Sequence, residues 1–220
     1  MRIFFIHGFG ENENIFEKIA PTIGGNQIFI NVWNEVGNIP QPELNVLAFA
    51  KKLSQNYTIT ENDVVIGHSM GGRIGLHIKH FSNCKLIQIA SWTNPDRVIS
   101  PIKNRETLYW LTKYGIYLNR FTKWLAVRKG FKNKPSRQIF EQTIDALIAG
   151  NKHCVVNQLR LIFEPVEAIN IEPELRIHAK ADNIIRKPKT DFYEVPGDHF
   201  TLVTYPETVV KPILEFLAIS

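Results

Sequence analysis

The sequence predicts an α/β fold, in which a mostly parallel sheet of about six strands carries helices on both faces. Short β-branched or aromatic runs alternate with longer segments of helical spacing along most of the chain. With 220 residues, 44% of them hydrophobic, the chain is long enough for one domain with a sizeable core. The alternation stops between Ala90 and Glu174, which predicts a helical insertion.

The strands are expected where short runs are rich in Val, Ile or aromatic residues, at 3–7, 27–32, 63–67, 85–90, 175–179 and 192–195. Helical spacing is found over 15–23, 43–55, 70–81 and 206–217. Between 94 and 171 the pattern is helix after helix, typical of a cap over the strand ends. The predicted organisation is a core part at 1–93, a helical cap insertion at 94–171, and a second core part at 172–220.

Composition excludes several classes of function. No apolar run approaches the roughly 20 residues that span a bilayer, and the N-terminus does not resemble a signal peptide. Cys84 and Cys154 fit no metal or disulfide pattern, which favours a cytoplasmic location. The net charge of +5 is mild, and no motif supports nucleic-acid binding. We therefore expect no metal, no cofactor, no nucleic-acid partner and no membrane association.

Ser69 lies in a G-x-S-x-G pattern between a predicted strand and a predicted helix. Such a strand-turn-helix is a nucleophile elbow, which strains the serine backbone and exposes its hydroxyl. Gly67 and Gly71 would leave room for the turn, and the helix beginning at Met70 would direct N–H groups toward a developing oxyanion. The alternative is a serine helix cap with glycines for close packing.

A serine hydroxyl needs a base, and His199 is the candidate because it follows the last predicted strand and precedes the last helix. The acid is expected on the turn after the preceding strand, where Asp182 lies. Asp96, after the strand that ends at Ala90, is the alternative acid. Asp198 is a poor contender because adjacent loop residues seldom point at the same nitrogen.

The first strand ends in His7-Gly8-Phe9-Gly10. Gly8 would let the chain turn so that the N–H of Phe9 joins the N–H of Met70 in an oxyanion hole. The tetrapeptide is informative because it precedes the serine motif in the order that this chemistry needs.

Four segments together resemble the signature blocks of the α/β-hydrolase superfamily: HGFGENENIF, VIGHSMGGRI, IHAKADNII and VPGDHFTLVTYPE. The resemblance implies a cofactor-free hydrolase with Ser69, Asp182 and His199 as its triad. It is nearest to small carboxylesterases, including those that act on carrier-bound acyl chains. The sequence departs from the family in lacking two leading strands and in leaving no room for a crossover helix between Asp182 and His199, so a minimal version of the fold is expected.

The expected function is cleavage of a carboxylic ester or thioester through an acyl-enzyme on Ser69, with His199 as general base and Asp182 orienting it. Two alternatives remain open. A lyase of the same fold would use the triad as a proton shuttle, and a catalytically idle binding protein would not turn over its ligand.

The cap concentrates positive charge, with ten Lys or Arg against the single acid Glu106 between 103 and 137. Over 107–127 the apolar residues approximate one buried helical stripe. The plainer interpretation is a solvated face on which long cationic side chains lie along the surface. The alternative hypothesis is that this face docks an acidic carrier of the substrate, an acyl carrier protein or coenzyme A, through Arg120, Lys123 and Arg128, with Tyr109, Trp110, Tyr114 and Trp124 lining or flanking an acyl channel. An anionic membrane would satisfy the same charges but would also need an exposed apolar stripe.

Overall fold

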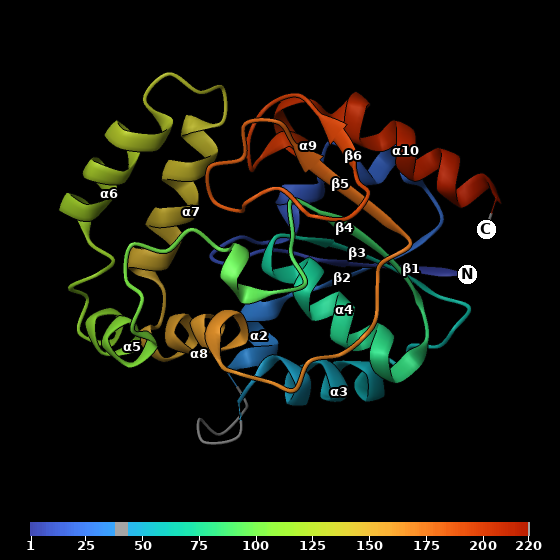
Figure 1. Ribbon diagram of the computed structural model, residues 1–220, viewed down its shortest axis with the longest axis horizontal. Helices are drawn as coiled ribbons and strands as arrows, with labels where there is room; N and C mark the ends of the chain where they lie inside the picture. Colours follow the sequence, from blue (N-terminus) through green and yellow to red (C-terminus); the bar gives the residue numbers. More distant parts are fainter. Residues whose placement is uncertain (38–43, 220) are drawn as a thin grey trace.

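The computed structural model describes residues 1–37 and 44–219. One sheet of parallel strands has the order β2-β1-β3-β4-β5-β6 (Figure 1). Its strands are β1 (Arg2–Ile6), β2 (Asn26–Ile30), β3 (Val64–His68), β4 (Lys85–Ile89), β5 (Leu175–Ala179) and β6 (Tyr193–Val195). The expected parallel sheet of about six strands is confirmed, and each strand lies in the region where the alternation predicted it.

Side chains of β1 point alternately into two hydrophobic cores, one on each face of the sheet. Phe4 and Ile6 pack with α2 (Val32–Val36), α3 (Val46–Asn56), α4 (Met70–Ser82) and α8 (Lys152–Phe163). Ile3 and Phe5 pack on the other face with η1 (Glu13–Phe16), α1 (Ala20–Ile23), α9 (Thr201–Thr204) and α10 (Pro206–Ile219). Burial on both faces explains why the strands are nearly continuous apolar runs.

The helices predicted outside the cap are found in the expected regions except at one place, and two short helices, α2 and α9, were not predicted. The single helix expected over 15–23 is wrong, because η1 and α1 are separate short helices. Pro21, in the first turn of α1, has no N–H to continue a helix from the preceding turn. Helix α3 begins at Val46, where the side chain of Asn45 accepts a hydrogen bond from the N–H of Ala48. Glu43, the expected first residue of that helix, lies outside the described residues.

Between β4 and β5 the chain forms η3 (Pro95–Arg97), α5 (Arg105–Lys113), α6 (Arg120–Ala126), the π-helix η4 (Val127–Phe131), α7 (Arg137–Ala149) and α8. Helices α5, α6 and α7 lie at the end of the molecule opposite both termini (Figure 1). Helix α8 packs against α3 and α4 and so belongs to one face of the core. The division into core and cap at 94 and 171 stays a prediction.

The single helical stripe expected over 107–127 is wrong, because the chain turns between α5 and α6. Gly115 has φ of +70°, a left-handed conformation that ends a helix and suits glycine. Asn119 then caps α6, its side chain accepting hydrogen bonds from the N–H groups of Phe121 and Thr122. These local signals override the apolar spacing.

The connection between β5 and β6, residues 180–192, contains no helix. It runs instead along the segment after β4, where the N–H of Ile99 donates to the carbonyl of Ile184 and the N–H of Arg186 to that of Arg97. This pairing holds the turn that carries Asp182. None of the described helices is long and apolar enough to cross a membrane.

Candidate active site

Ser69 occupies the sharp turn between β3 and α4, with φ of 53° and ψ of −120°. This strained backbone is possible because the flanking glycines leave room for it. A Cβ on Gly71 would lie 1.9 Å from the carbonyl oxygen of Ile6, and one on Gly67 would lie 2.4 Å from the nitrogen of Gly72. Any side chain at either position would force the turn apart.

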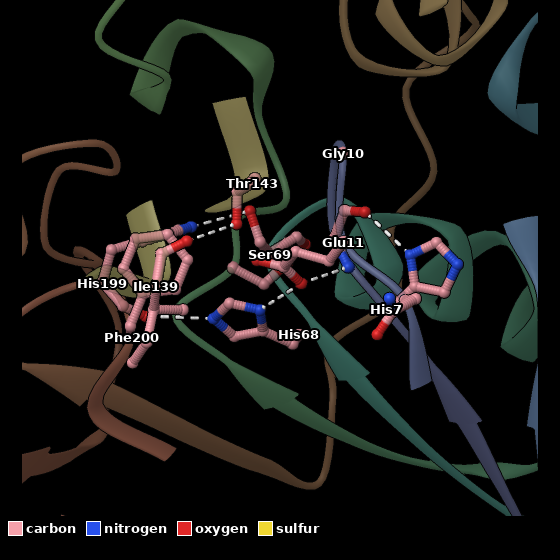
Figure 2. A network of polar contacts seen from close by, with 12 residues as sticks. His7, Gly10, Glu11, His68, Ser69, Ile139, Thr143, His199 and Phe200 are labelled. Atoms are coloured by element: carbon pink, nitrogen blue, oxygen red, sulfur yellow. Dashed lines mark hydrogen bonds and ion pairs between the residues drawn. The ribbon is translucent and has the colours of Figure 1, made fainter. Parts of the chain in front are cut away.

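The structure brings Ser69, His199 and Asp182 into one hydrogen-bonded chain, of which Figure 2 shows the serine and histidine. Asp182 Oδ2 lies 2.9 Å from His199 Nδ1, and His199 Nε2 lies 2.9 Å from Ser69 Oγ. A carboxylate only accepts, so Nδ1 carries the proton and Nε2 is left to accept from the serine hydroxyl. The other carboxylate oxygen of Asp182 accepts from the N–H groups of Ile184 and Ile185.

Asp182 is an ionised carboxylate in this arrangement. Burial by itself would raise its pKa, but attraction to the His199 ring in its protonated form and the hydrogen bond between the two side chains hold the pKa below the ordinary aspartate value. Asp96, the alternative acid, is exposed on η3 and makes no contact with His199 in the described part of the chain. It lines a separate cavity of about 390 Å³ with Arg97 and Arg176.

The loop after β1 lies directly against the serine. A Cβ on Gly8 would lie 2.9 Å from Ser69 Cβ and 2.7 Å from Glu11 Oε2, so only glycine fits there. Among the described residues, neither the N–H of Phe9 nor that of Met70 has a hydrogen-bond acceptor. Met70 is the first residue of α4, where helical N–H groups have no partner within the helix. Both N–H groups are therefore without an acceptor in the described part of the chain.

A buried pair that the sequence analysis missed, Glu11 and His68, links three segments of the site (Figure 2). Glu11 Oε2 accepts from the N–H of Gly8 at 2.6 Å and lies 2.8 Å from His68 Nδ1. The other ring nitrogen of His68 lies 3.0 Å from the carbonyl oxygen of His199. One side-chain pair thus ties the loop after β1, the residue before the nucleophile, and the backbone of the base.

Both ring nitrogens of His68 face oxygen atoms that accept hydrogen bonds, so the ring carries two protons and a positive charge. Burial lowers the pKa of His68, but the charge of Glu11 and the hydrogen bond to it outweigh burial and raise that pKa. For Glu11, burial raises the pKa, but the charge of His68 and their hydrogen bond bring it below the ordinary value. The pair is a buried, internally neutral ion pair.

Glu11, His68 and His199 offer ligand atoms within 4.8 Å of one another, a separation that a metal ion could bridge. Each of these atoms is engaged in a hydrogen bond, Glu11 with His68 and His199 with Ser69. A metal at this position would have to displace the bond between the serine and its base. The three side chains are therefore better described as parts of a hydrogen-bond network than as the ligands of a metal ion.

Asp198, next to the base, connects its loop to the cap. Its Oδ2 accepts from Ser136 Oγ at 2.5 Å, and Lys134 Nζ lies 3.7 Å from the same oxygen. Its Oδ1 accepts from the N–H of Phe200. The carboxylate thus anchors the start of α7 to the loop of His199 and is directed away from the imidazole nitrogens.

A cavity of about 460 Å³ opens between the loop after β1, α7 and α9. Its lining includes Glu11, Ile139 and Thr143. Figure 2 shows Ile139 and Thr143 beside Ser69 and His199. Helix α7 therefore forms one wall of a cavity that shares the loop after β1 with the site, although neither Ser69 nor His199 is part of its lining.

The three cations expected to dock a carrier differ in their surroundings. Lys123 Nζ lies 2.6 Å from Asp145 Oδ2, so its charge is neutralised locally. Arg128 lies over the ring of Trp124 at 5.3 Å, and Arg120 is exposed. Of the four aromatic residues expected along an acyl channel, Tyr109 is buried under the guanidinium of Arg160. The other three, Trp110, Tyr114 and Trp124, are more than half exposed, and Trp124 lines a hollow of about 330 Å³ together with Arg120 and Lys123.

Solved structures resemble this chain over almost its whole length. The enol-lactonase from Burkholderia xenovorans LB400 has a TM-score of 0.74 at 12% identity, covering 99% of this chain and 91% of that one. A thermophilic esterase from Thermogutta terrifontis has a TM-score of 0.68 at 17% identity, covering 99% and 89%. An extracellular α/β-hydrolase from a Paenibacillus species has a TM-score of 0.68 at 13% identity, covering 98% of each chain.

These similarities, with the sheet order, show that the chain has the α/β-hydrolase fold, in agreement with the resemblance seen in the sequence. No model of a known protein family matches the chain, and no curated protein matches it.

Proposed function

We propose that this chain is a serine hydrolase that cleaves a carboxylic ester or thioester through an acyl-enzyme on Ser69. The observation that carries the proposal is the chain of two 2.9 Å hydrogen bonds from Ser69 through His199 to Asp182. A serine hydroxyl is a weak nucleophile until a base within hydrogen-bond reach removes its proton. The tautomer that Asp182 imposes leaves His199 Nε2 able to do so.

In the acylation half of the reaction, Ser69 Oγ bonds to the carbonyl carbon while its proton moves to His199 Nε2. His199 then returns that proton to the leaving alcohol or thiol as the carbon–oxygen or carbon–sulfur bond breaks. In the second half, water attacks the acyl carbon and gives a proton to His199, which passes a proton to Ser69 Oγ as the bond between the acyl carbon and Oγ breaks and the carboxylic acid leaves. The buried carboxylate of Asp182, with its lowered pKa, stabilises the imidazolium that forms in both halves.

The N–H groups of Phe9 and Met70 would stabilise the negative charge on the substrate oxygen. Neither N–H has an acceptor among the described residues, and the Met70 N–H lies at the positive end of α4. Preorganised donors of this kind lower the barrier because they need no reorientation during the reaction.

The substrate would occupy the cavity walled by Ile139 and Thr143 of α7. Its volume of about 460 Å³ suits a small molecule or an acyl chain. An acyl carrier protein or coenzyme A stays a predicted partner, and the ion pair between Lys123 and Asp145 weakens the basis for it.

The decisive experiment is hydrolysis of p-nitrophenyl esters and acyl thioesters of graded chain length by the wild type and by Ser69→Ala. A fluorophosphonate should label Ser69, and mass spectrometry should detect an acyl group on the same residue. Turnover without an acyl intermediate would indicate a lyase that uses the triad as a proton shuttle. Ligand binding without turnover or labelling would indicate a catalytically idle binding protein.

A further inference from the structure

Large apolar side chains are exposed in one short part of the cap. Of twelve exposed large hydrophobic residues in the described chain, five lie between 110 and 124, on α5, on α6 and in the turn between them. We call these five the α5–α6 surface: Trp110 (55% exposed), Tyr114 (60%), Ile116 (49%), Phe121 (67%) and Trp124 (52%). Helix α5 buries Leu108 and Tyr109 toward the core, so the exposed residues are those that its packing leaves outside.

The exposed rings are arranged in neighbouring pairs. The ring centroids of Trp110 and Tyr114 are 5.2 Å apart, and those of Phe121 and Trp124 are 6.0 Å apart. Both pairs lie at the end of the molecule opposite the termini, where α6 is outermost (Figure 1). Exposed apolar groups concentrated in this way mark an interaction surface.

The same part of the chain is strongly basic. From 107 to 140 there is no Asp or Glu, against eight Lys or Arg. Three of the eight have carboxylate partners from elsewhere: Lys123 with Asp145, Lys134 with Asp198, and Arg137 with Glu141. The other five are exposed and have no carboxylate partner in the described part of the chain: Lys113, Arg120, Arg128, Lys129 and Lys132.

Cations and aromatic rings are also in direct contact on this surface. Lys113 Nζ lies 5.8 Å from the ring centre of Tyr114, and the guanidinium of Arg128 lies 5.3 Å from that of Trp124. Tyrosine and tryptophan favour the boundary between water and lipid, because one part of each ring system is apolar and another polar. Lysine and arginine beside them would reach the phosphate groups of lipids.

We propose that the α5–α6 surface docks onto an anionic lipid bilayer. Its exposed rings would enter the headgroup region while the five unpaired cations contact lipid phosphates. This is attachment to one face of a membrane and requires no spanning helix. It departs from the expectation of no membrane association, because the exposed apolar residues that such attachment needs are present on this surface. It is independent of the proposed chemistry at Ser69, although it would place the cap, and the α7 wall of the cavity, next to amphiphilic substrates.

Two other occupants fit the surface less well. In a two-fold dimer through this surface, the five unpaired cations would face the same five on the second copy, which is electrostatically unfavourable. An acidic protein would satisfy the charges, but in the hollow of about 330 Å³ beside Trp124 the cations Lys123 and Arg137 already pair with Asp145 and Glu141. Projecting rings are better suited to a soft lipid boundary.

The test is co-sedimentation of the whole chain with vesicles of phosphatidylcholine, with and without 30% phosphatidylglycerol (about a third of the lipid, enough for a strong negative surface potential). We expect binding to the anionic vesicles at low salt and weaker binding at high salt, because salt screens the attraction. Phe121→Ser with Trp124→Ser should weaken binding roughly tenfold or more, and Arg120→Glu with Arg128→Glu should abolish preference for the anionic lipid.

The matched controls lie on α10, where Leu214 is an exposed apolar residue and Lys211 an exposed cation. Leu214→Ser and Lys211→Glu should leave vesicle binding unchanged, and all variants should keep the wild-type melting temperature. No binding of the folded wild type to anionic vesicles would overturn the proposal, as would binding that both cap double variants retain. Dimer formation that the aromatic variants abolish, or binding only to an acyl carrier protein, would overturn it in favour of a protein partner.

Discussion

The loops around Ser69 and the α5–α6 surface use polar and apolar side chains in opposite ways. Around Ser69, the charged side chains are buried and each is hydrogen-bonded to a histidine: Asp182 to His199, and Glu11 to His68. On the α5–α6 surface, aromatic rings are exposed beside cations that have no carboxylate partner in the described chain. Buried charge demands exact geometry, because an unpaired charge there is costly. Exposed rings require only the boundary between water and lipid, where their exact positions matter less.

This difference predicts that single substitutions will act strongly at the first region and weakly at the second. The largest effect is expected for Ser69→Ala, which should lower kcat/KM for a p-nitrophenyl ester by several orders of magnitude. Only binding and the oxyanion donors would remain, roughly 10³ to 10⁴ over water. Steady-state kinetics measure the loss, and the melting temperature should be unchanged. Activity retained by this variant would place the nucleophile elsewhere.

The second prediction separates the two possible acids. Asp182→Asn should lower kcat by about 10⁴, because an amide in this place favours the wrong imidazole tautomer. Asp96→Asn should leave kcat close to the wild-type value, since Asp96 is exposed and does not contact His199. The two rates are compared on the same ester. The reverse pattern would move the acid to Asp96.

The third prediction concerns the buried pair. Glu11→Ala should lower the free energy of unfolding by about 3–5 kcal/mol, because it leaves the charge of His68 buried without its partner. Glu11→Gln should cost less, since its amide oxygen can still accept one hydrogen bond. Denaturant unfolding measures both. Equal stability of the alanine variant and the wild type would show that the pair does not hold the loops.

The fourth prediction is the pH dependence of the same pair. The lowered pKa of Glu11 adds stability above its unfolded value of about 4.3, and this is lost as the pH falls through the folded pKa. The raised pKa of His68 adds stability below about 6.5, and this is lost as the pH rises through the folded pKa.

The difference in unfolding free energy between the wild type and Glu11→Gln should therefore be largest between about pH 4.3 and 6.5. Denaturant titrations at a series of pH values measure it. A difference that stays constant up to pH 9 would contradict a charged His68.

The smallest effect is expected on the cap. Charge reversal at Arg120, Lys123 and Arg128 should change kcat/KM for a short neutral ester by less than about twofold, because exposed charges are screened at roughly 8 Å in physiological salt. The predicted carrier docking is tested by measuring kcat/KM of the same variants for an ester of an acyl carrier protein at low and high salt. A carrier preference that responds to neither salt nor reversal would count against that docking.

Much of the fold and part of the candidate site could be predicted from the sequence, because their signals are local. The alternation of apolar runs and helical spacing is set by side-chain periods within each element, and it predicted the parallel sheet. The glycines around Ser69 follow from the shape of one turn. The order of serine, acid and histidine motifs gave the candidates that the structure brings within hydrogen-bond distance.

Tertiary structure alone decided the contacts between distant segments. His68 bonds to Glu11 across 57 positions and to the backbone of His199 across 131, and nothing local to either residue indicates such a partner. The exposure of Trp110 and Trp124 was equally hidden, because apolar spacing over 107–127 suggested one helix, whereas the turn at Gly115 changes which faces meet the core. Periodicity determines which residues share a face of one element, but only packing between elements determines whether that face is covered.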